Sequence, residues 1–169
     1  MNENRRLFFA LLPDDHTQQA LQQLSTALPL TTRQRIRAEN FHITLVFIGS
    51  VNKELMPKII ELAQPIKIQA MSLVFDQLEY WRGADVLCLT CSRPEPLLTN
   101  LVTQLSTPLA DLEIKLDTRP YCPHVTLARH IHELPTTKFQ PITWNAQQFA
   151  LMESVSDTSG VIYQPLQVW

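Results

Sequence analysis

Glycine is scarce in this sequence, and long apolar runs are missing from it. The 169 residues include only three glycines, at positions 49, 83 and 160. There is therefore no glycine-rich loop of the kind that cradles the phosphates of ATP. No apolar run approaches the roughly 20 residues that cross a bilayer as a helix. We accordingly expect no ATP site and no membrane partner.

The N-terminal apolar run, residues 7–12, ends at Pro13-Asp14-Asp15. A signal peptide would end in small residues before a cleavage site, whereas proline and aspartate are typical of the start of a helix. We therefore predict a buried first strand followed by a helix. The three cysteines, Cys88, Cys91 and Cys122, are an odd number without a framework spacing, which favours a reducing, cytoplasmic location.

The overall composition is that of a globular chain with little net charge. Hydrophobic residues make up 45% of the chain, charged residues 18%, and the formal net charge is -2. At this length we predict one domain over residues 1–169, with a substantial core. A charge so close to zero excludes a global basic field for nucleic acids, so RNA would have to be bound by a local patch.

Hydrophobic periodicity predicts strands that alternate with helices. The order of the predicted elements indicates an α+β fold, in which helices cover the outer faces of antiparallel sheet. The predicted helices span about residues 13–28, 53–63 and 97–110, and the predicted strands about 7–12, 41–49, 66–78, 86–91, 123–129, 149–154 and 161–168.

Two of the predicted strands carry the same pattern of polar residues, 82 positions apart. His42 and Thr44 lie two residues apart in an aliphatic run, and His124 and Thr126 repeat the arrangement. In a strand each pair shares one face. An unpaired imidazole buried in a core is costly, so a buried histidine on a strand needs a reason. Because two strands each carry such a histidine, the sequence suggests two half-sites that meet across a cleft.

The residue types of these half-sites are suited to phosphoryl chemistry. Two imidazoles across a cleft can act as a general acid and a general base, because histidine titrates near neutral pH. The threonine hydroxyls are short donors that could hold the oxygens of a phosphate. The competing interpretation is that one histidine is a satisfied core residue, and the matched pair disfavours it.

The paired motif resembles that of the two-histidine phosphoesterase superfamily, in particular its RNA 2',3'-cyclic phosphodiesterase branch, the bacterial 2'-5' RNA ligase family. The resemblance rests on Asn40-Phe41-His42-Ile43-Thr44-Leu45-Val46-Phe47-Ile48-Gly49 and on Pro123-His124-Val125-Thr126-Leu127-Ala128-Arg129. The flanking segments 6–10, 149–154 and 163–166 support it and extend it over the chain.

This resemblance implies a fold and a reaction. The fold would be bilobal with pseudo-two-fold symmetry, and two antiparallel sheets would line a central cleft with helices outside. The reaction would convert an RNA or nucleotide 2',3'-cyclic phosphate to a 2'-phosphomonoester, without metal or other cofactor. The resemblance makes His42 the proton donor and His124 the proton acceptor, whereas the symmetry of the two motifs leaves these roles open. Thr44 and Thr126 would bind non-bridging oxygens. Run backwards, the same chemistry would join a 2'-phosphate end to a 5'-hydroxyl.

Further residues are candidates for binding the substrate. Phe47 and Arg129 each lie five positions after their histidine. Pseudo-symmetry would make them face each other at the rim, where they could sandwich a base. Strict strand alternation puts this offset on the wrong face, so the arrangement requires a bulge or a strand end. Arg35, with its neighbours Arg33 and Arg37 on one face of an extended segment, could contact RNA phosphates, or the three could form a solvated edge.

Other sites and functions are also open at this point. His130 and His132 share a strand face but lack third and fourth ligands, so we expect no metal site. A phosphodiesterase acting on another cyclic or 2'-5'-linked nucleotide would need the same motifs, because these read the phosphate and not the base. A non-catalytic module that binds RNA ends would not need the acid-base pair. We expect the protein to act as a monomer.

Overall fold

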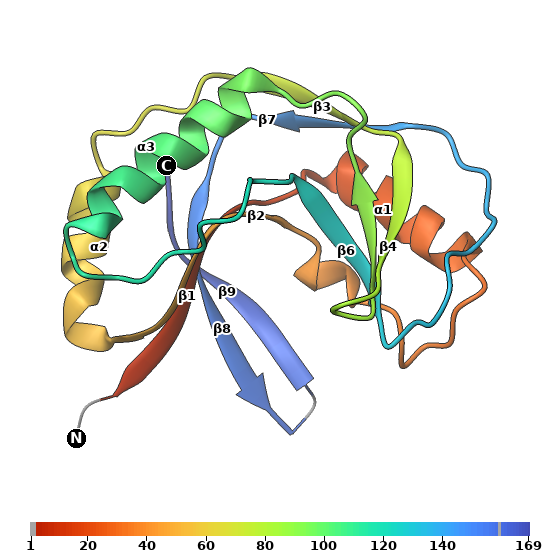
Figure 1. The fold of residues 1–169 in the computed structure, drawn as a ribbon, viewed down its shortest axis with the longest axis horizontal. Helices are drawn as coiled ribbons and strands as arrows, with labels where there is room; N and C mark the ends of the chain where they lie inside the picture. The colour runs from red at the N-terminus through yellow and green to blue at the C-terminus, as the bar shows by residue number, and fades with distance from the viewer. Residues whose placement is uncertain (1–2, 159) are drawn as a thin grey trace.

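The computed structural model describes residues 3–158 and 160–169, and it has the α+β architecture that the sequence predicts (Figure 1). No helix in this part of the chain is both long and apolar enough to cross a membrane. The helices are α1 (Asp15–Ala27), α2 (Met56–Ala63) and α3 (Pro96–Ala110), with short 3-10 helices at Ala38–Asn40 and Lys53–Leu55. The strands are β1 (Asn4–Leu11), β2 (Ile43–Asn52), β3 (Met71–Phe75), β4 (Gln77–Trp81), β5 (Val86–Thr90), β6 (His124–Arg129), β7 (Ile142–Ala146), β8 (Ala150–Asp157) and β9 (Gly160–Val168).

The strands form three sheets, and all their pairings are antiparallel. One sheet has the order β2-β1-β8-β9 and another the order β4-β5-β6, while β3 pairs with β7 alone. The first two sheets lie in opposite halves of the molecule, and each contributes one histidine strand, β2 or β6 (Figure 1). This confirms the bilobal arrangement, with a small additional sheet that the sequence did not predict.

Helices cover the outer sides of these sheets. Helix α1 begins where Pro13-Asp14-Asp15 predicts, because the Asp14 carboxylate accepts a hydrogen bond from the backbone N–H of Thr17 at 2.7 Å and caps the helix. Helix α1 packs against β7, and α3 packs against both α2 and β2. One hydrophobic cluster contains buried residues from both histidine strands and all three helices. The two halves of the cleft are therefore supported by a common core.

The two histidine strands contain the same irregularity at the same place. In β2, Leu45 is the extra residue between the pairs Phe9–Val46 and Ala10–Thr44, and in β6 Leu127 is the extra residue between Leu87–Ala128 and Cys88–Thr126. From each histidine onward, six residues are half-buried, buried, half-buried, buried, buried and exposed. A bulge residue reverses the alternation of faces. The fifth residue after each histidine therefore returns to the cleft face.

Several sequence predictions are wrong in detail. The strand predicted for residues 66–78 begins at Met71 and is divided into β3 and β4, which pair in different sheets. The sequence analysis does not predict strand β7, because the strand has only five residues and follows a proline-containing loop. Its alternation of apolar and polar residues is too short to stand out from that loop. Residues 32–34 form a turn, so the arginines at 33, 35 and 37 are not on one extended face. Strand β6 ends at Arg129, and His130 follows with a φ of 56°, so His130 and His132 do not share a strand.

We predict that the bulge in β6 depends on the burial of its extra side chain. Leu127 is fully buried, so replacing it with alanine should lower the free energy of unfolding by about 2–5 kcal/mol, since it removes apolar contacts and leaves a cavity. Urea denaturation measures the change. Leu134→Ala is the matched control, because Leu134 is 49% exposed and should change stability by at most about 0.5 kcal/mol. Equal losses in the two variants would contradict this account.

Candidate active site

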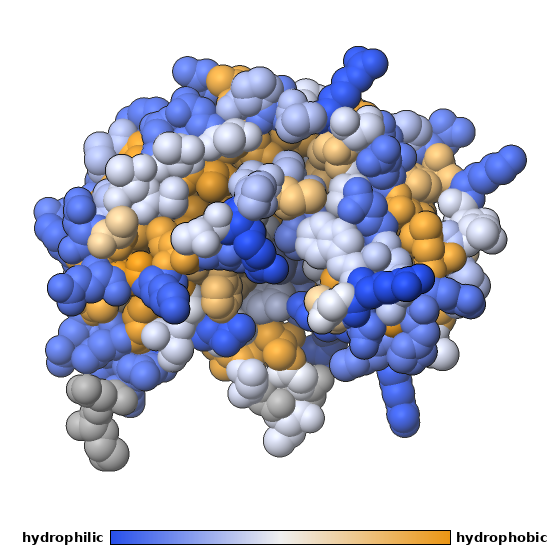
Figure 2. All heavy atoms as spheres, in the orientation of Figure 1, coloured by the Kyte–Doolittle hydropathy of each residue, from blue (hydrophilic) through white to orange (hydrophobic). Residues whose placement is uncertain are grey.

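The two histidine strands border a cavity of about 180 Å³ between the lobes. Its lining brings together all four residues of the paired motif, from two segments that lie 82 positions apart in the chain. The lining residues are Arg6, Phe8, Ile36, Asn40, His42, Thr44, Phe47, His124, Thr126, Arg129, Ser154 and Tyr163. Figure 2 shows the face of the molecule on which this region is hollowed, with hydrophilic and hydrophobic side chains around the hollow.

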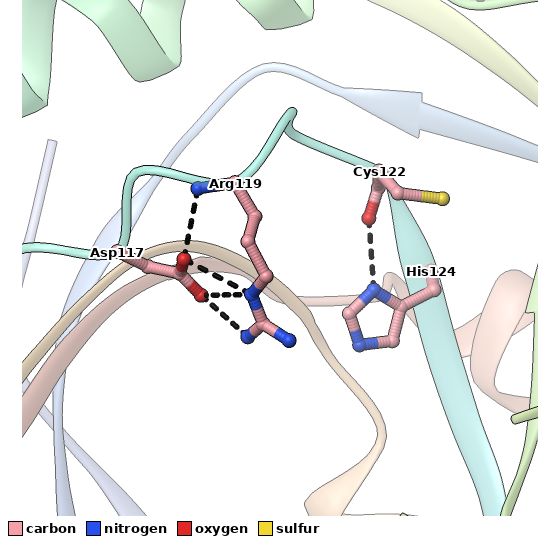
Figure 3. A network of polar contacts seen from close by, with 4 residues as sticks. All are labelled: Asp117, Arg119, Cys122 and His124. Carbon is pink, nitrogen blue, oxygen red and sulfur yellow. Dashed lines mark hydrogen bonds and ion pairs between the residues drawn. The ribbon is translucent and has the colours of Figure 1, made fainter. Parts of the chain in front are cut away.

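Each imidazole is oriented by the same backbone contact. His42 Nδ1 lies 2.7 Å from the carbonyl oxygen of Asn40, and His124 Nδ1 lies 2.8 Å from that of Cys122, as Figure 3 shows for the second pair. A carbonyl oxygen can only accept, so both Nδ1 atoms carry hydrogen and the neutral rings present Nε2 as the basic atom. The Thr44 hydroxyl lies 3.0 Å from His42 Nε2 and donates to it. The site therefore holds two basic nitrogens and two hydroxyls.

The two rings differ in what encloses them. His42 packs against Phe8 and Tyr163, with ring centroids 5.1 and 4.9 Å away. His124 packs against Trp81 alone among the aromatic rings of the described residues, at 4.5 Å. The Asn40 side chain fixes the enclosure of His42, because it donates to the carbonyl of Val161 at 2.8 Å and accepts from the N–H of Tyr163 at 3.2 Å. The β8–β9 hairpin is thus tied to the histidine that it covers.

Burial sets the protonation of both histidines. Desolvation is the largest cause that lowers the pKa of His42 below its usual value, and the nearby charges of His124 and Arg129 lower it further. The pKa of His124 is also lowered, first by desolvation and then by Arg129, while the Cys122 carbonyl and Glu79 oppose the shift. Both imidazoles are consequently neutral in the free protein at neutral pH. An anionic ligand between them would favour the protonated form of one.

Phe47 and Arg129 both line the cavity, as the pseudo-symmetry predicts. The paired bulges supply the reversal of faces that this placement requires. Arg6 was not predicted, and its guanidinium carbon lies 4.7 Å from the centre of the Phe47 ring. This stacking covers one face of the phenyl ring. A base bound in the cavity would therefore meet the other face of Phe47.

Arg35 lies elsewhere, which corrects its prediction as a substrate-binding residue. Its Nη2 donates to the carbonyl oxygens of Leu28 at 2.8 Å and Leu30 at 2.9 Å, just after the end of α1. It is absent from the lining of the cavity, where its neighbour Ile36 is found. The carbonyls at a helix C-terminus lack partners within the helix and attract cations. Arg35 therefore has a structural role at that end of α1.

Other lining residues escaped the sequence analysis for a common reason. Asn40 and Tyr163 are brought together by contacts across more than 120 positions. Arg6 and Phe8 alternate on β1, but nothing in the chain marks that strand as the neighbour of the first motif.

Among residues 3–158 and 160–169, no group of three histidine, cysteine, aspartate or glutamate residues is placed to hold a metal ion.

Known proteins are similar to this chain in both sequence and fold. A family model described as LigT like Phosphoesterase matches residues 11–87 and 90–163. An RNA 2',3'-cyclic phosphodiesterase of Escherichia coli is 30% identical, over 100% of this chain and 98% of the relative. One of Methanocaldococcus jannaschii is 24% identical, over 97% and 99%. The crystal structure of E. coli LigT complexed with 3'-AMP has a TM-score of 0.87 at 26% identity and covers 99% of this chain and 98% of that one.

The position of Arg35 leads to a prediction about stability. Arg35→Met should lower the free energy of unfolding by about 1–3 kcal/mol, since the carbonyls of Leu28 and Leu30 lose a charged donor. Chemical denaturation monitored by circular dichroism measures this. Arg33→Met is the control, because Arg33 is exposed and should change stability by at most about 0.5 kcal/mol. If Arg35→Met were as stable as the parent, a role in capping α1 would be ruled out.

Proposed function

The chain belongs to the family of LigT-like phosphoesterases, and on that premise we propose that it hydrolyses RNA 2',3'-cyclic phosphate ends to 2'-phosphomonoesters. The observation that carries the proposal is the shared cavity, into which two imidazoles present Nε2 beside two threonine hydroxyls. The relatives named for this reaction match over nearly the whole chain. We further propose that the protein works as a cytoplasmic monomer, since one chain supplies both histidines.

In the proposed mechanism the two histidines act on opposite sides of the phosphorus. His124 Nε2 takes a proton from water, whose oxygen forms a bond to phosphorus. The bond from phosphorus to the 3'-oxygen breaks, and His42 gives that oxygen its proton, which leaves a 2'-phosphomonoester and a 3'-hydroxyl. Thr44 and Thr126 donate to the non-bridging oxygens, whose charge grows in the transition state. The family resemblance assigns the two roles.

The charges around the cavity support this cycle. A cyclic phosphodiester carries one negative charge, and it would favour the protonated form of a histidine whose pKa is low in the free protein. Substrate binding would thereby create the acid that the reaction needs. Arg6 and Arg129 line the same cavity and would offset the charge of the phosphate. We place the base of the terminal nucleotide against the open face of Phe47, beside Arg129.

We expect the parent protein to convert 2',3'-cyclic AMP to 2'-AMP in excess EDTA. His42→Ala and His124→Ala should each lower kcat/KM by about 100-fold or more, because each removes a general acid or base. Chromatography that separates 2'-AMP from 3'-AMP measures both the rate and the isomer. His130→Ala is the control, since His130 is exposed and outside the cavity.

The opposite results are equally informative. Turnover that disappears in EDTA would refute the two-imidazole mechanism. Absence of turnover on cyclic nucleotides, combined with binding of 2'-phosphate ends that survives both alanine substitutions, would identify a binding module. Turnover restricted to other cyclic or 2'-5'-linked nucleotides would retain the mechanism and change the substrate.

The pKa shifts predict an acidic pH optimum. The free enzyme must hold one neutral and one protonated histidine, and both pKa values lie below about 6.5, so kcat/KM should peak below that pH. Arg129→Gln removes a cation that lowers both pKa values, so the whole profile should move to higher pH. Initial rates across pH measure the shift. Arg6→Gln should weaken activity without moving the optimum; an equal displacement in both variants would contradict the assignment.

A further inference from the structure

A carboxylate that the paired motif does not contain lies close to His124, on the same face of the sheet β4-β5-β6. Glu79 of β4 is the register partner of Cys88, and Cys88 is the register partner of Thr126 in the second motif. Residues directly opposite one another in antiparallel strands share a face of the sheet. Glu79 is half-buried, and it lines neither the active-site cavity nor the cavity of about 580 Å³ on the other side of His124. Contact with the substrate therefore does not account for this carboxylate.

Two donors hold the Glu79 carboxylate, one at each oxygen. Thr90 Oγ1 donates to Oε1 at 2.9 Å, and the indole Nε1 of Trp81 donates to Oε2 at 2.8 Å. Thr90 is 1% exposed and is the register partner of His124. Hydrogen bonds to an ionised acceptor are about twice as strong as those between neutral groups. The carboxylate is thus held in a fixed direction beside the histidine.

The second of these donors is also the side chain that packs against His124. The ring centroids of Trp81 and His124 lie 4.5 Å apart, with an interplanar angle of 58°. A tryptophan side chain has two rotatable bonds, and the hydrogen bond to Glu79 restrains both. The carbonyl of Cys122 holds Nδ1 of the same imidazole (Figure 3). The ring of His124 is therefore held by a carbonyl at one edge and by an indole that Glu79 holds in turn.

The charge of Glu79 distinguishes His124 from His42. Burial lowers the pKa of His124 most and Arg129 lowers it further, while the Cys122 carbonyl and Glu79 oppose the shift. Burial is also the largest cause of the lowered pKa of His42, and there the charges of His124 and Arg129 add to it. A general base becomes a cation when it takes a proton, and a nearby anion stabilises that cation. Glu79 is placed to do this for one of the two histidines.

Several other ionisable side chains border the same cavities as His124 or lie beside its strand. They are Arg6, His42 and Tyr163 from β1, β2 and β9, Cys88 from β5, and Asp117 with Arg119 from the segment before β6. Burial raises the pKa of the Cys88 thiol to about 12, so the thiol is neutral. Asp117 and Arg119 form an ion pair with each other (Figure 3). Among the described residues, Glu79 is therefore the carboxylate whose charge acts on the pKa of His124.

We propose that Glu79 is a positioning residue for the general base of this site. It acts through Trp81, which it holds against His124, and through its charge, which stabilises the imidazolium that forms when His124 takes the proton from water. Glu79 itself neither gains nor loses a proton and does not touch the reacting atoms. This inference rests on the proposed hydrolase function, in which His124 is the base. It adds a group that makes the two histidines unequal.

The first test measures the pKa of each histidine in the free protein. Proton NMR of the imidazole Cε1–H signals across pH, assigned with single His→Ala variants, gives these values without any turnover. Glu79→Gln removes the charge and keeps an oxygen that accepts from Trp81. We expect the pKa of His124 to fall, because an anion that favours its protonated form is lost, and that of His42 to change less. Glu133→Gln is the control, since Glu133 is exposed and should move neither value.

The second test measures kcat and KM for 2',3'-cyclic AMP. Glu79→Ala should lower kcat by about tenfold or more, as does the loss of other groups that orient a functional histidine, and should leave KM unchanged. Trp81→Phe keeps an aromatic ring but loses the N–H that Glu79 accepts. In the Trp81→Phe background the fall caused by Glu79→Ala should therefore be smaller, by about threefold or more, since the link is already broken. The NMR spectra of the same samples show whether each variant is folded.

The outcomes separate this inference from the proposed function. Failure of the parent to hydrolyse 2',3'-cyclic AMP would refute the proposed function, and with it the role of His124 as the base. Normal turnover in the parent, combined with an unchanged pKa of His124 in Glu79→Gln, would overturn the inference alone. A rise in KM at constant kcat would also overturn it, because Glu79 would then serve substrate binding. Independent effects of Glu79→Ala and Trp81→Phe on kcat would contradict the link through the indole.

Discussion

The hydrogen bond from each histidine Nδ1 to the carbonyl oxygen two residues earlier is the constraint on which the site depends. It fixes the tautomer and the direction of both rings at once, with distances of 2.7 and 2.8 Å. The carbonyl belongs to the segment that enters the strand, so the strand itself orients the ring. Without this contact an imidazole could present either nitrogen, and the pair would not reliably offer two basic atoms to one phosphate. The other contacts in the cleft surround two rings whose orientation these two hydrogen bonds fix.

The paired bulges are the second element of that geometry. A regular strand would place the first and third residues of the motif in the cleft and turn the sixth toward the core. The extra residues Leu45 and Leu127 reverse the alternation and bring Phe47 and Arg129 back to the cleft. Both extra side chains are buried. The core therefore holds each bulge in place, and the position of these two cavity-lining residues depends on packing on the opposite face.

Much of this arrangement could be predicted from the sequence, because it depends on patterns of residues that are close together in the chain. The repeated His-x-Thr spacing predicts two polar faces, and the Pro13-Asp14-Asp15 segment predicts the start of α1. The sequence indicates the bulges only weakly. In each motif two adjacent apolar residues, Leu45-Val46 and Leu127-Ala128, interrupt the alternation of polar and apolar residues. The contacts of Asn40 with β9 could not be predicted, since they join residues more than 120 positions apart. The prediction that Arg35 contacts RNA was wrong because it rested on charge alone, whereas the guanidinium donates to the carbonyls of Leu28 and Leu30.

The two motifs are alike, but the residues around His42 and around His124 differ. The two sides of the cleft are therefore not equivalent. Tyr163, held by Asn40, covers His42, while among the described residues His124 has one aromatic neighbour and also lines a second cavity of about 580 Å³. Two chemically equivalent histidines thus meet different environments. A proton donor to a leaving oxygen needs no access for a second molecule, whereas a base must accept whichever nucleophile arrives. This difference between the two sides is consistent with the roles that we propose from the family resemblance, with His42 as the acid and His124 as the base.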